Sequence, residues 1–258
     1  MFNIKTAIKI IKTIKNWPLF FADYFKLTTN RNIIYSLRNG IKLEVRPKTF
    51  DRGAIAEIFI NKLYTPNGFE INEYDVVLDI GAHIGIFSIF ASMFAKNGII
   101  YSFEPMPENF ILLKRNIELN NIKNVFISNK AVAKKRGHTI MNISEDHTGA
   151  HSMYYDFGKG GIKVQTISLN DFIKKNKLKK IDFLKMDCEG AEYEILYNLP
   201  KNVLNSIKKI SMEYHNINET YNVTNLVAFL EKNDFEVNAI INKRATSNLL
   251  YAKRKSIQ

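Results

Sequence analysis

The segment from Val76 to Gly85 places an acidic residue and two glycines where a small molecule can be bound. The apolar run Val76-Val77-Leu78-Asp79-Ile80 is typical of a buried strand, and Gly81 and Gly85 follow it closely. Glycine adopts positive φ at little cost and has no Cβ, so it allows a tight turn and a close approach of the backbone to a ligand. The segment therefore predicts a strand, a turn and a ligand site at the end of the strand.

The spacing of these residues distinguishes between two kinds of nucleotide cofactor. Sites for dinucleotides carry the pattern G-x-G-x-x-G, whereas this chain has D-x-G-x-x-x-G from Asp79 to Gly85. An acidic residue repels a pyrophosphate, but it suits S-adenosylmethionine, which carries an ammonium and a sulfonium group. The spacing therefore favours S-adenosylmethionine and disfavours a nicotinamide oxidoreductase.

A second carboxylate stands at the end of the next predicted strand, in Phe103-Glu104-Pro105. A carboxylate at this place can accept hydrogen bonds from both hydroxyl groups of a ribose. We predict that Asp79 serves the amino group of the cofactor, directly or through water, and that Glu104 serves its ribose. The residues predicted to bind the cofactor are Asp79, Gly81, Ala82, His83, Gly85, Glu104 and Pro105.

A third group of charged residues ends the apolar strand predicted at 181–186. Lys185 lies within this strand, and a buried lysine is costly unless it is paired, so we expect a carboxylate beside it. Asp187 and Glu189 follow, and we predict that they orient an acceptor hydroxyl. A metal site there is less favoured, and we assign no metal ligand. The alternative is that Asp187 only neutralises Lys185 and that Glu189 only begins a helix.

His215 stands at the end of the strand predicted at 208–214, on the same face as Ser211 and Glu213. Its ordinary pKa is close to neutrality, so we predict that it is the general base for a hydroxyl acceptor. A hydrogen-bonded pair of Glu213 and His215 with a structural role is the alternative. His147 and His151 lie in a polar loop, and their roles stay open.

The elements that must position these residues follow an alternating pattern of short apolar runs and helical stretches. Such a pattern indicates βαβ units, a parallel sheet, helices on both faces, and a ligand site at the carboxyl ends of the strands. The predicted strands are 76–80, 99–103, 125–132, 181–186, 208–214, 235–241 and 248–253, and the predicted helices are 85–96, 107–120, 190–198 and 223–232.

Three ordered motifs resemble the FkbM-type methyltransferases. They are D-I-G-A-x-x-G-x-F-S from Asp79 to Ser88, F-E-P-x-P-x-N-F from Phe103 to Phe110, and K-x-D-x-E-G-A-E from Lys185 to Glu192. The resemblance covers roughly residues 51–215 and implies a Rossmann-like class I methyltransferase fold, with a mostly parallel seven-stranded sheet and an antiparallel terminal strand. It also implies S-adenosylmethionine as donor and, usually, a sugar hydroxyl or another small metabolite as acceptor. His83 departs from the family, which often has asparagine there, and asparagine tolerates positive φ better.

The first 70 residues are predicted to form an accessory segment in front of a methyltransferase domain at 71–258. Residues 1–25 have isoleucines and lysines at helical spacing and predict a basic amphipathic helix. Asn39-Gly40 predicts a hairpin at 33–46, and Asp51 can begin a second helix. The amphipathic helix favours either contact with a membrane surface or packing on the domain, with isoleucine side chains inside.

Composition narrows the class of protein further. The chain has 258 residues, a net charge of +12 and one cysteine, Cys188. A single cysteine excludes an intramolecular disulfide framework, and we expect a cytoplasmic protein, with membrane association possible through residues 1–25. The positive charge keeps a nucleic-acid methyltransferase open as an alternative, and a non-catalytic binding module on the same fold is the other.

Overall fold

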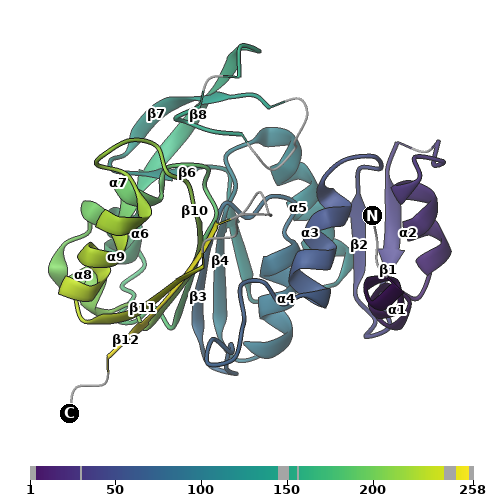
Figure 1. Ribbon diagram of the computed structural model, residues 1–258, viewed down its shortest axis with the longest axis horizontal. Helices are drawn as coiled ribbons and strands as arrows, with labels where there is room; N and C mark the ends of the chain where they lie inside the picture. Colours follow the sequence, from purple (N-terminus) through teal and green to yellow (C-terminus); the bar gives the residue numbers. More distant parts are fainter. Residues whose placement is uncertain (1–3, 30, 145–150, 156, 241–247, 256–258) are drawn as a thin grey trace.

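A seven-stranded sheet runs through the centre of the computed structural model, which describes residues 4–29, 31–144, 151–155, 157–240 and 248–255 (Figure 1). Its strands are β3 (Val76–Ile80), β4 (Ile99–Phe103), β5 (Val125–Ser128), β9 (Phe183–Met186), β10 (Lys209–Tyr214), β11 (Phe235–Ile240) and β12 (Asn248–Arg254). Their order is β11-β12-β10-β9-β3-β4-β5. The pairs from β10 to β5 are parallel, and β12 is antiparallel to both neighbours. The predicted fold class is confirmed.

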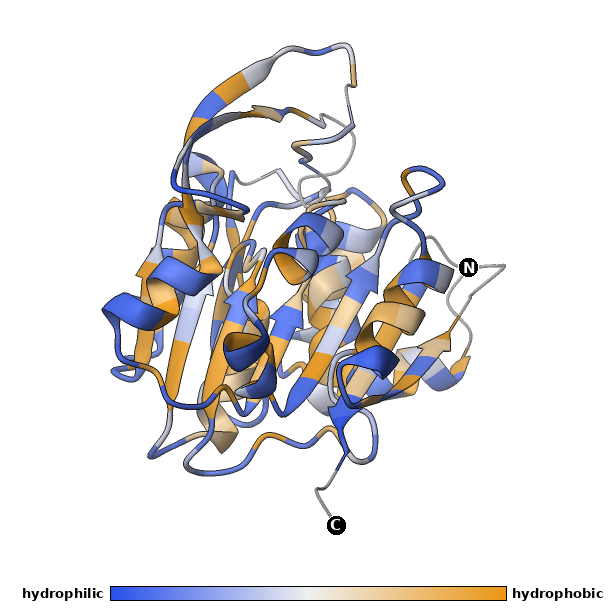
Figure 2. Ribbon diagram, turned by 90° about the vertical axis from the view of Figure 1, so that its left-hand side faces the viewer, coloured by the Kyte–Doolittle hydropathy of each residue, from blue (hydrophilic) through white to orange (hydrophobic). Residues whose placement is uncertain are grey.

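Helices cover both faces of this sheet because successive strand residues point in opposite directions. Val77 belongs to the hydrophobic core beneath α4 (Ile86–Phe94) and α5 (Pro107–Leu119). Leu78 belongs to the core on the other face. The helices on that face are α6 (Leu169–Lys175), α7 (Glu192–Tyr197), α8 (Lys201–Asn205) and α9 (Val223–Lys232). Figure 2 shows the apolar strands between more polar helix surfaces and connecting loops.

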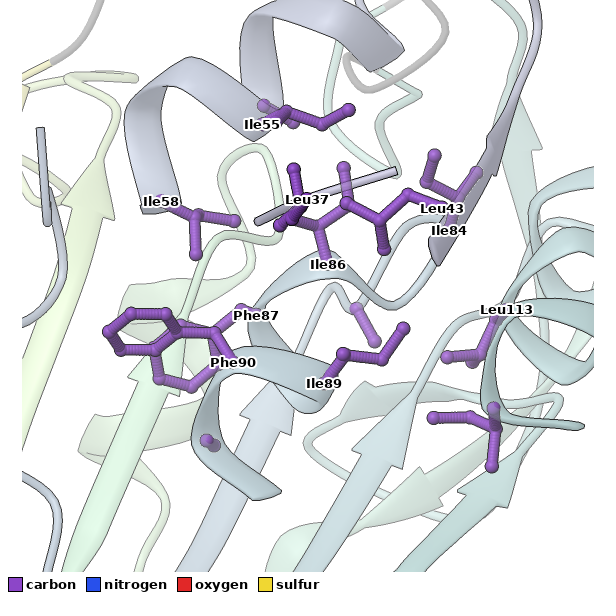
Figure 3. Packing of buried hydrophobic residues seen from close by; sticks show 14 of the residues in the cluster. Leu37, Leu43, Ile55, Ile58, Ile84, Ile86, Phe87, Ile89, Phe90 and Leu113 are labelled. Carbon is purple, nitrogen blue, oxygen red and sulfur yellow. The ribbon is translucent and has the colours of Figure 1, made fainter. Parts of the chain in front are cut away.

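The N-terminal segment packs against α4 and α5. Its elements are α1 (Ile4–Thr13), α2 (Trp17–Tyr24), β1 (Ile33–Ser36), β2 (Lys42–Val45), α3 (Asp51–Ile55) and the π-helix η1 (Ala56–Ile60). Figure 3 shows Leu43 and Ile55 from this segment near Ile86 and Leu113, within one continuous core. The predicted hairpin is confirmed, with Ile33 opposite Val45. A domain boundary near residue 70 stays a prediction.

The single helix predicted at 1–25 is wrong, because the chain breaks between α1 and α2. Pro18 lies in the first turn of α2, where its missing N–H is tolerated. The Asn16 side chain, just before α2, accepts a hydrogen bond from the Ser36 backbone (2.8 Å) and donates one to the Ile34 carbonyl (2.9 Å). Asn16 thus ties the break to the hairpin. No helix among the described residues is long and apolar enough to cross a membrane.

A second, three-stranded sheet was not predicted. It consists of β6 (Ala131–Ala133), β7 (Gly137–Asn142) and β8 (Gly161–Ser168), in the order β6-β8-β7. The strand predicted at 125–132 is therefore wrong at its end, because β5 stops at Ser128 and β6 pairs with β8 instead. Helices α6 and α8 were also not predicted, and α7 begins at Glu192, two residues later than expected. Figure 1 shows the small sheet beside the ends of the central strands.

Candidate active site

A cavity of about 310 Å³ lies at the carboxyl ends of β3, β4, β9 and β10. This is the edge of a parallel sheet where ligands bind in doubly wound folds. Its walls also include Glu57 and Ile58 from η1, and Met141 from the small sheet. The ends of the central strands thus form one wall of the cavity, and the N-terminal segment and the small sheet form further walls.

Glu104 forms one end of the cavity, directly after β4. It is only 4% exposed, and its Oε2 accepts a hydrogen bond from the His83 backbone N–H at 2.8 Å. Its Oε1 accepts one from the Met106 N–H, also at 2.8 Å. Burial raises the pKa of Glu104 above its ordinary value, although His83 and these backbone donors oppose the shift. The carboxylate is therefore held firmly between two turns, with Pro105 beside it in the cavity wall.

The two glycines of the turn after β3 are required by its positive φ angles, and Gly81 also by its packing. Gly81 has a φ of +77°, and a Cβ there would lie 1.7 Å from the carbonyl oxygen of Asp187. Gly85 has a φ of +87°, and its Cβ would lie 2.4 Å from Leu113. A side chain at Gly81 would clash with the backbone of the β9 turn, whereas at Gly85 the positive φ is the stronger requirement, because the end of the Leu113 side chain can move. Gly81 and Ala82 line the cavity, whereas Gly85 packs behind it.

His83 joins this turn to the N-terminal segment. It adopts a φ of +51°, in the left-handed region, and lines the cavity. Its Nε2 lies 3.3 Å from Asp51 Oδ1 and 3.1 Å from Arg46 Nη2. Burial alone would raise the pKa of Asp51, but His83 and Arg46 outweigh it and lower that pKa. The His83 ring thus connects the turn after β3 to Arg46 and Asp51 of the N-terminal segment.

Asp79 does not lie in the cavity wall, which disfavours a direct contact with a cofactor amino group, and a contact through water stays a prediction. The side chain is fully buried, and its Oδ2 accepts a hydrogen bond of 2.6 Å from Ser88. Its Oδ1 lies 3.2 Å from Lys185 Nζ. Asp79 therefore balances the charge of a buried lysine behind the turn, where it positions the residues that face the cavity.

Lys185 is the centre of this buried network, and the prediction that it has a carboxylate neighbour is confirmed. Its ammonium donates to the Gly81 carbonyl at 2.6 Å and lies 3.8 Å from Asp187 Oδ2. Burial alone would lower the pKa of Lys185, but Asp79 and Asp187 raise it above its ordinary value. The lysine is a fixed cation that joins the turns after β3 and β9.

Asp187 has a second partner, Tyr64, which the sequence did not indicate. The Tyr64 hydroxyl donates to Asp187 Oδ2 at 2.9 Å, and the tyrosine ring lies beneath the Lys185 ammonium at 5.1 Å. The Asp187 side chain is 28% exposed and lines the cavity. Asp187 therefore pairs with Lys185, as the alternative interpretation held, and also faces the site.

His215 follows β10 and is enclosed by carboxylates. Its Nε2 lies 3.1 Å from Glu189 and 3.9 Å from Glu213, and its Nδ1 lies 3.3 Å from Glu192. Burial alone would lower the pKa of His215, but Glu189 and Glu192 raise it to about 12. These carboxylates therefore favour the imidazolium form of the ring. Because a protonated histidine cannot accept a proton, they disfavour the predicted role as general base, which stays a prediction.

One interpretation of the sequence was that Glu189 begins a helix. The structure differs, because α7 begins at Glu192. Glu189 adopts a φ of +52°, three residues before α7, and its neighbour Gly190 also has positive φ. Left-handed backbone at a residue with a long side chain is uncommon and often occurs at functional sites. Burial raises the pKa of Glu189, and its partner His215 opposes the shift. Glu192 instead ties the turn, accepting hydrogen bonds from the Cys188 and Gly190 N–H groups.

Glu57 is a second cavity residue that the sequence did not indicate. It lies in the π-helix η1, and such helices frequently occur at functional sites. Burial, followed by the nearby charge of Asp187, raises the pKa of Glu57 to about 7. The apolar residues around it predicted only a packing helix, so no pattern marked this position. His151 also lines the cavity, and His147 lies outside the described residues.

The fold and the site together define the class. A central sheet of this topology, with a buried carboxylate after the second strand and a cavity beside it, is that of the class I methyltransferases. The chain matches the family described as the methyltransferase FkbM domain over residues 79–237, which is more than half of its length. This protein belongs to the FkbM methyltransferase family, and the resemblance of the three motifs is confirmed.

Relatives in this family have diverged widely in sequence. The 31-O-demethyl-FK506 methyltransferase FkbM of Streptomyces tacrolimicus is 25% identical, over 70% of this chain and 80% of its own length. The hexuronic acid methyltransferase AglP of Haloferax volcanii is 25% identical, over 62% of this chain and 64% of its own length. The crystal structure of a methyltransferase FkbM from Methylobacillus flagellatus has a TM-score of 0.53 at 15% identity, over 74% of this chain and 47% of that chain. The chain thus spans less than two thirds of the latter two proteins.

Proposed function

We propose that this protein is an S-adenosylmethionine-dependent methyltransferase that methylates a hydroxyl group of a sugar or another small metabolite. The observation that carries the proposal is the position of Glu104, a buried carboxylate at the tip of β4 that faces the cavity. A carboxylate there suits the two hydroxyl groups of a ribose. When bound, the cofactor supplies an electrophilic methyl group on a positively charged sulfur.

The chemistry of the cavity walls fits this cofactor. Four further carboxylates line the cavity, Glu57, Asp187, Glu189 and Glu213. Negative side chains of this kind favour a ligand that carries a sulfonium and an ammonium, and they disfavour a pyrophosphate. We assign Glu104 to the ribose of the cofactor. Gly81, Ala82 and His83 form the adjoining turn that lies against the cofactor, and Gly85 supports this turn from behind.

The acceptor is assigned to the end of the cavity formed by Asp187, Glu189 and Glu57. Methyl transfer is an in-line displacement whose main demand is positioning, and a carboxylate can orient a hydroxyl by accepting its hydrogen bond. The two relatives named above support a hydroxyl-bearing acceptor, because their names specify 31-O-demethyl-FK506 and hexuronic acid. Glu57 is the group that we assign to receive the hydroxyl proton, since its pKa of about 7 lies near physiological pH.

His215 then acts as a fixed positive charge. Its imidazolium lies 3.1 Å from Glu189 and keeps that carboxylate in the cavity wall despite the cost of burial. We therefore assign Glu189 to the acceptor and His215 to the positioning of Glu189. The left-handed conformation of Glu189 in the turn after β9 supports this assignment, since such conformations cluster at functional sites.

The test of this function has two parts. Titration calorimetry should show that the folded protein binds S-adenosylmethionine, with nicotinamide dinucleotide as the negative control. A transfer assay with radiolabelled methyl groups should then label the glycan or small-molecule fraction of a cell extract. Folded protein that binds no cofactor would support a non-catalytic module, and label in nucleic acid alone would support the other alternative.

A further inference from the structure

Within the N-terminal segment, the surface of residues 4–43 carries an excess of positive charge. Eight exposed cations lie between residues 4 and 43, Lys5, Lys9, Lys12, Lys15, Lys26, Arg31, Arg38 and Lys42. The one carboxylate among the described residues of this range is Asp23, which is fully buried. Its oxygens accept hydrogen bonds from Tyr35 and Arg52. The exposed side chains of residues 4–43 therefore present cations alone, and the next carboxylate, Glu44, is 20% exposed and pairs with Arg115.

Helix α1 shows how apolar residues are placed among these cations. Ile10 and Ile14 are fully buried against the rest of the protein, whereas Ile4 is 80% exposed and Ile8 is 47% exposed. Residues four apart lie on the same face of a helix, so Ile4 and Ile8 form one exposed strip. Lys5, Lys9 and Lys12 are also exposed, in the sector next to this strip. The predicted apolar stripe is thus divided, with part of it inside and part of it facing solvent.

The turn after α2 exposes two larger apolar side chains, Phe25 at 64% and Leu27 at 72%. Lys26 between them adopts a φ of +60°, which is uncommon for a residue other than glycine. Its backbone N–H donates to the Asp23 carbonyl at 2.9 Å, and the Leu27 N–H donates to the Ala22 carbonyl at 2.8 Å. Asp23, which begins this turn, is held below by Tyr35 and Arg52. A hydrogen-bonded turn therefore holds Phe25 and Leu27 outward on either side of a lysine.

We propose that two parts of this segment, α1 and the turn at 25–27, together bind an anionic membrane surface. Phe25, Leu27, Ile4 and Ile8 would enter the boundary between headgroups and acyl chains, while the lysines contact anionic headgroups. Apolar side chains next to cations are the pattern of interfacial attachment, and each basic residue near such a surface adds to the attraction. This inference does not depend on the proposed methyl transfer.

Two other partners fit this surface less well. Nucleic acid would use the cations, and a base could stack on Phe25, but the exposed aliphatic side chains of Ile4, Ile8 and Leu27 offer a base no stacking face. A second copy of the chain would use the apolar residues, but it would bring two sets of lysines together, which is unfavourable. Figure 1 shows the segment at the end of the molecule opposite α6, α8 and α9, so a flat surface can reach it.

Sedimentation with vesicles tests the proposal on the full chain. The protein should bind vesicles of phosphatidylcholine with phosphatidylglycerol, and it should bind vesicles of phosphatidylcholine alone at least about tenfold more weakly. The double variant Phe25→Ser, Leu27→Ser should bind the anionic vesicles about tenfold more weakly or worse. The matched control is Phe126→Ser, Ile111→Ser, which removes side chains that are 53% and 51% exposed elsewhere.

A second pair of variants tests the charge. Lys5→Glu, Lys9→Glu, Lys12→Glu should abolish binding, whereas Lys174→Glu, Lys175→Glu, Lys179→Glu should retain most of it, because those exposed lysines lie at and beyond the end of α6. Circular dichroism verifies that each variant is folded. The proposal is overturned if the wild-type protein binds neither kind of vesicle, or both equally. It is also overturned if the Phe25, Leu27 variant binds as the wild type does, or if the same residues instead mediate RNA binding or dimerisation.

Discussion

Tyr64 donates a hydrogen bond of 2.9 Å to Asp187, although 123 positions separate the two residues. Tyr64 precedes the part of the chain that matches the FkbM family, and Asp187 lies within it. The bond fixes a cavity carboxylate from the N-terminal side, and His83 makes a second such link through Asp51. The N-terminal segment therefore completes the site as well as covering one face of the sheet.

Removal of the Tyr64 hydroxyl should lower turnover and leave cofactor affinity nearly unchanged. In Tyr64→Phe, Asp187 loses a donor and is held less well, and one hydrogen bond contributes about 0.5–1.5 kcal/mol. We expect turnover to fall by roughly three- to tenfold. Steady-state kinetics and calorimetry measure the two quantities, with Tyr74→Phe, at a 65% exposed tyrosine, as the control. A large loss of cofactor affinity with normal turnover would contradict the assignment of Asp187 to the acceptor.

Truncation of Glu104 should weaken cofactor binding more than any other single change in the site. Hydrogen bonds to a charged group contribute about 1.5–3 kcal/mol, so Glu104→Ala should raise the dissociation constant for S-adenosylmethionine at least about tenfold. Glu108→Ala, an exposed position in α5, is the control. Because Glu104 also holds His83 and Met106, urea unfolding must accompany the calorimetry. Unchanged affinity in a folded Glu104→Ala protein would remove the ribose assignment.

His215 should contribute to stability through its positive charge. His215→Gln leaves Glu189 and Glu192 without their cation, and breaking a buried pair of this kind costs about 3 kcal/mol. The folded-state pKa of His215 is about 12, above its ordinary value of 6.5. The stabilising contribution is therefore complete below pH 6.5 and is lost as pH rises toward 12. Urea unfolding from pH 6 to 10 should show that the difference in free energy of unfolding between wild type and His215→Gln becomes smaller as pH rises. If the variant has normal stability but has lost turnover, His215 would instead be assigned as a base.

Glu57 should give the enzyme a pH dependence near neutrality. Its pKa is raised from 4.5 to about 7, so its proton is lost in the folded protein only as pH rises past neutrality. Because the folded protein holds this proton more tightly than the unfolded chain, protonation of Glu57 stabilises the folded state. This contribution to the free energy of unfolding is lost as pH rises from 4.5 to about 7. If Glu57 receives the acceptor proton, kcat/KM should rise with pH through about 7 and then level off. Glu57→Gln should remove this rise, whereas the exposed Glu231→Gln should keep it; an unchanged profile in Glu57→Gln would exclude the role.

The central sheet could be predicted from the sequence, because its strands are apolar runs that end in Asp79, Glu104 and Asp187. In the small sheet, the alternation of Val164 and Thr166 with exposed Lys163 and Gln165 was an available signal for β8. The pairing of this sheet could not be predicted, because it joins segments separated by a long loop. The closeness of Asp79, Glu104 and Asp187 followed from the parallel topology, since the carboxyl ends of parallel strands lie at one edge of the sheet.

The partners of the site residues were harder to predict, because they depend on tertiary contacts. The near-neutral pKa of a free histidine favoured His215 as a base, but Glu189 in the turn after β9 and Glu192 at the start of α7 raise its pKa. Asp79 at a strand end suggested a ligand contact, but its carboxylate pairs with Lys185 on the neighbouring strand. Glu57 and Tyr64 have no motif of their own, and only the packing of the N-terminal segment brings them to the cavity.

The atom that receives the methyl group is the most direct test of the central claim. The protein should be incubated with S-adenosylmethionine carrying a ¹³C-labelled methyl group and with the fraction of cell extract that accepts label, and the product should be examined by NMR. We predict that the label appears as an O-methyl group on a glycan or small molecule, and that the signal falls in Tyr64→Phe. Folded protein that binds the cofactor but yields only N-methyl or C-methyl products, or no labelled product, would contradict the account.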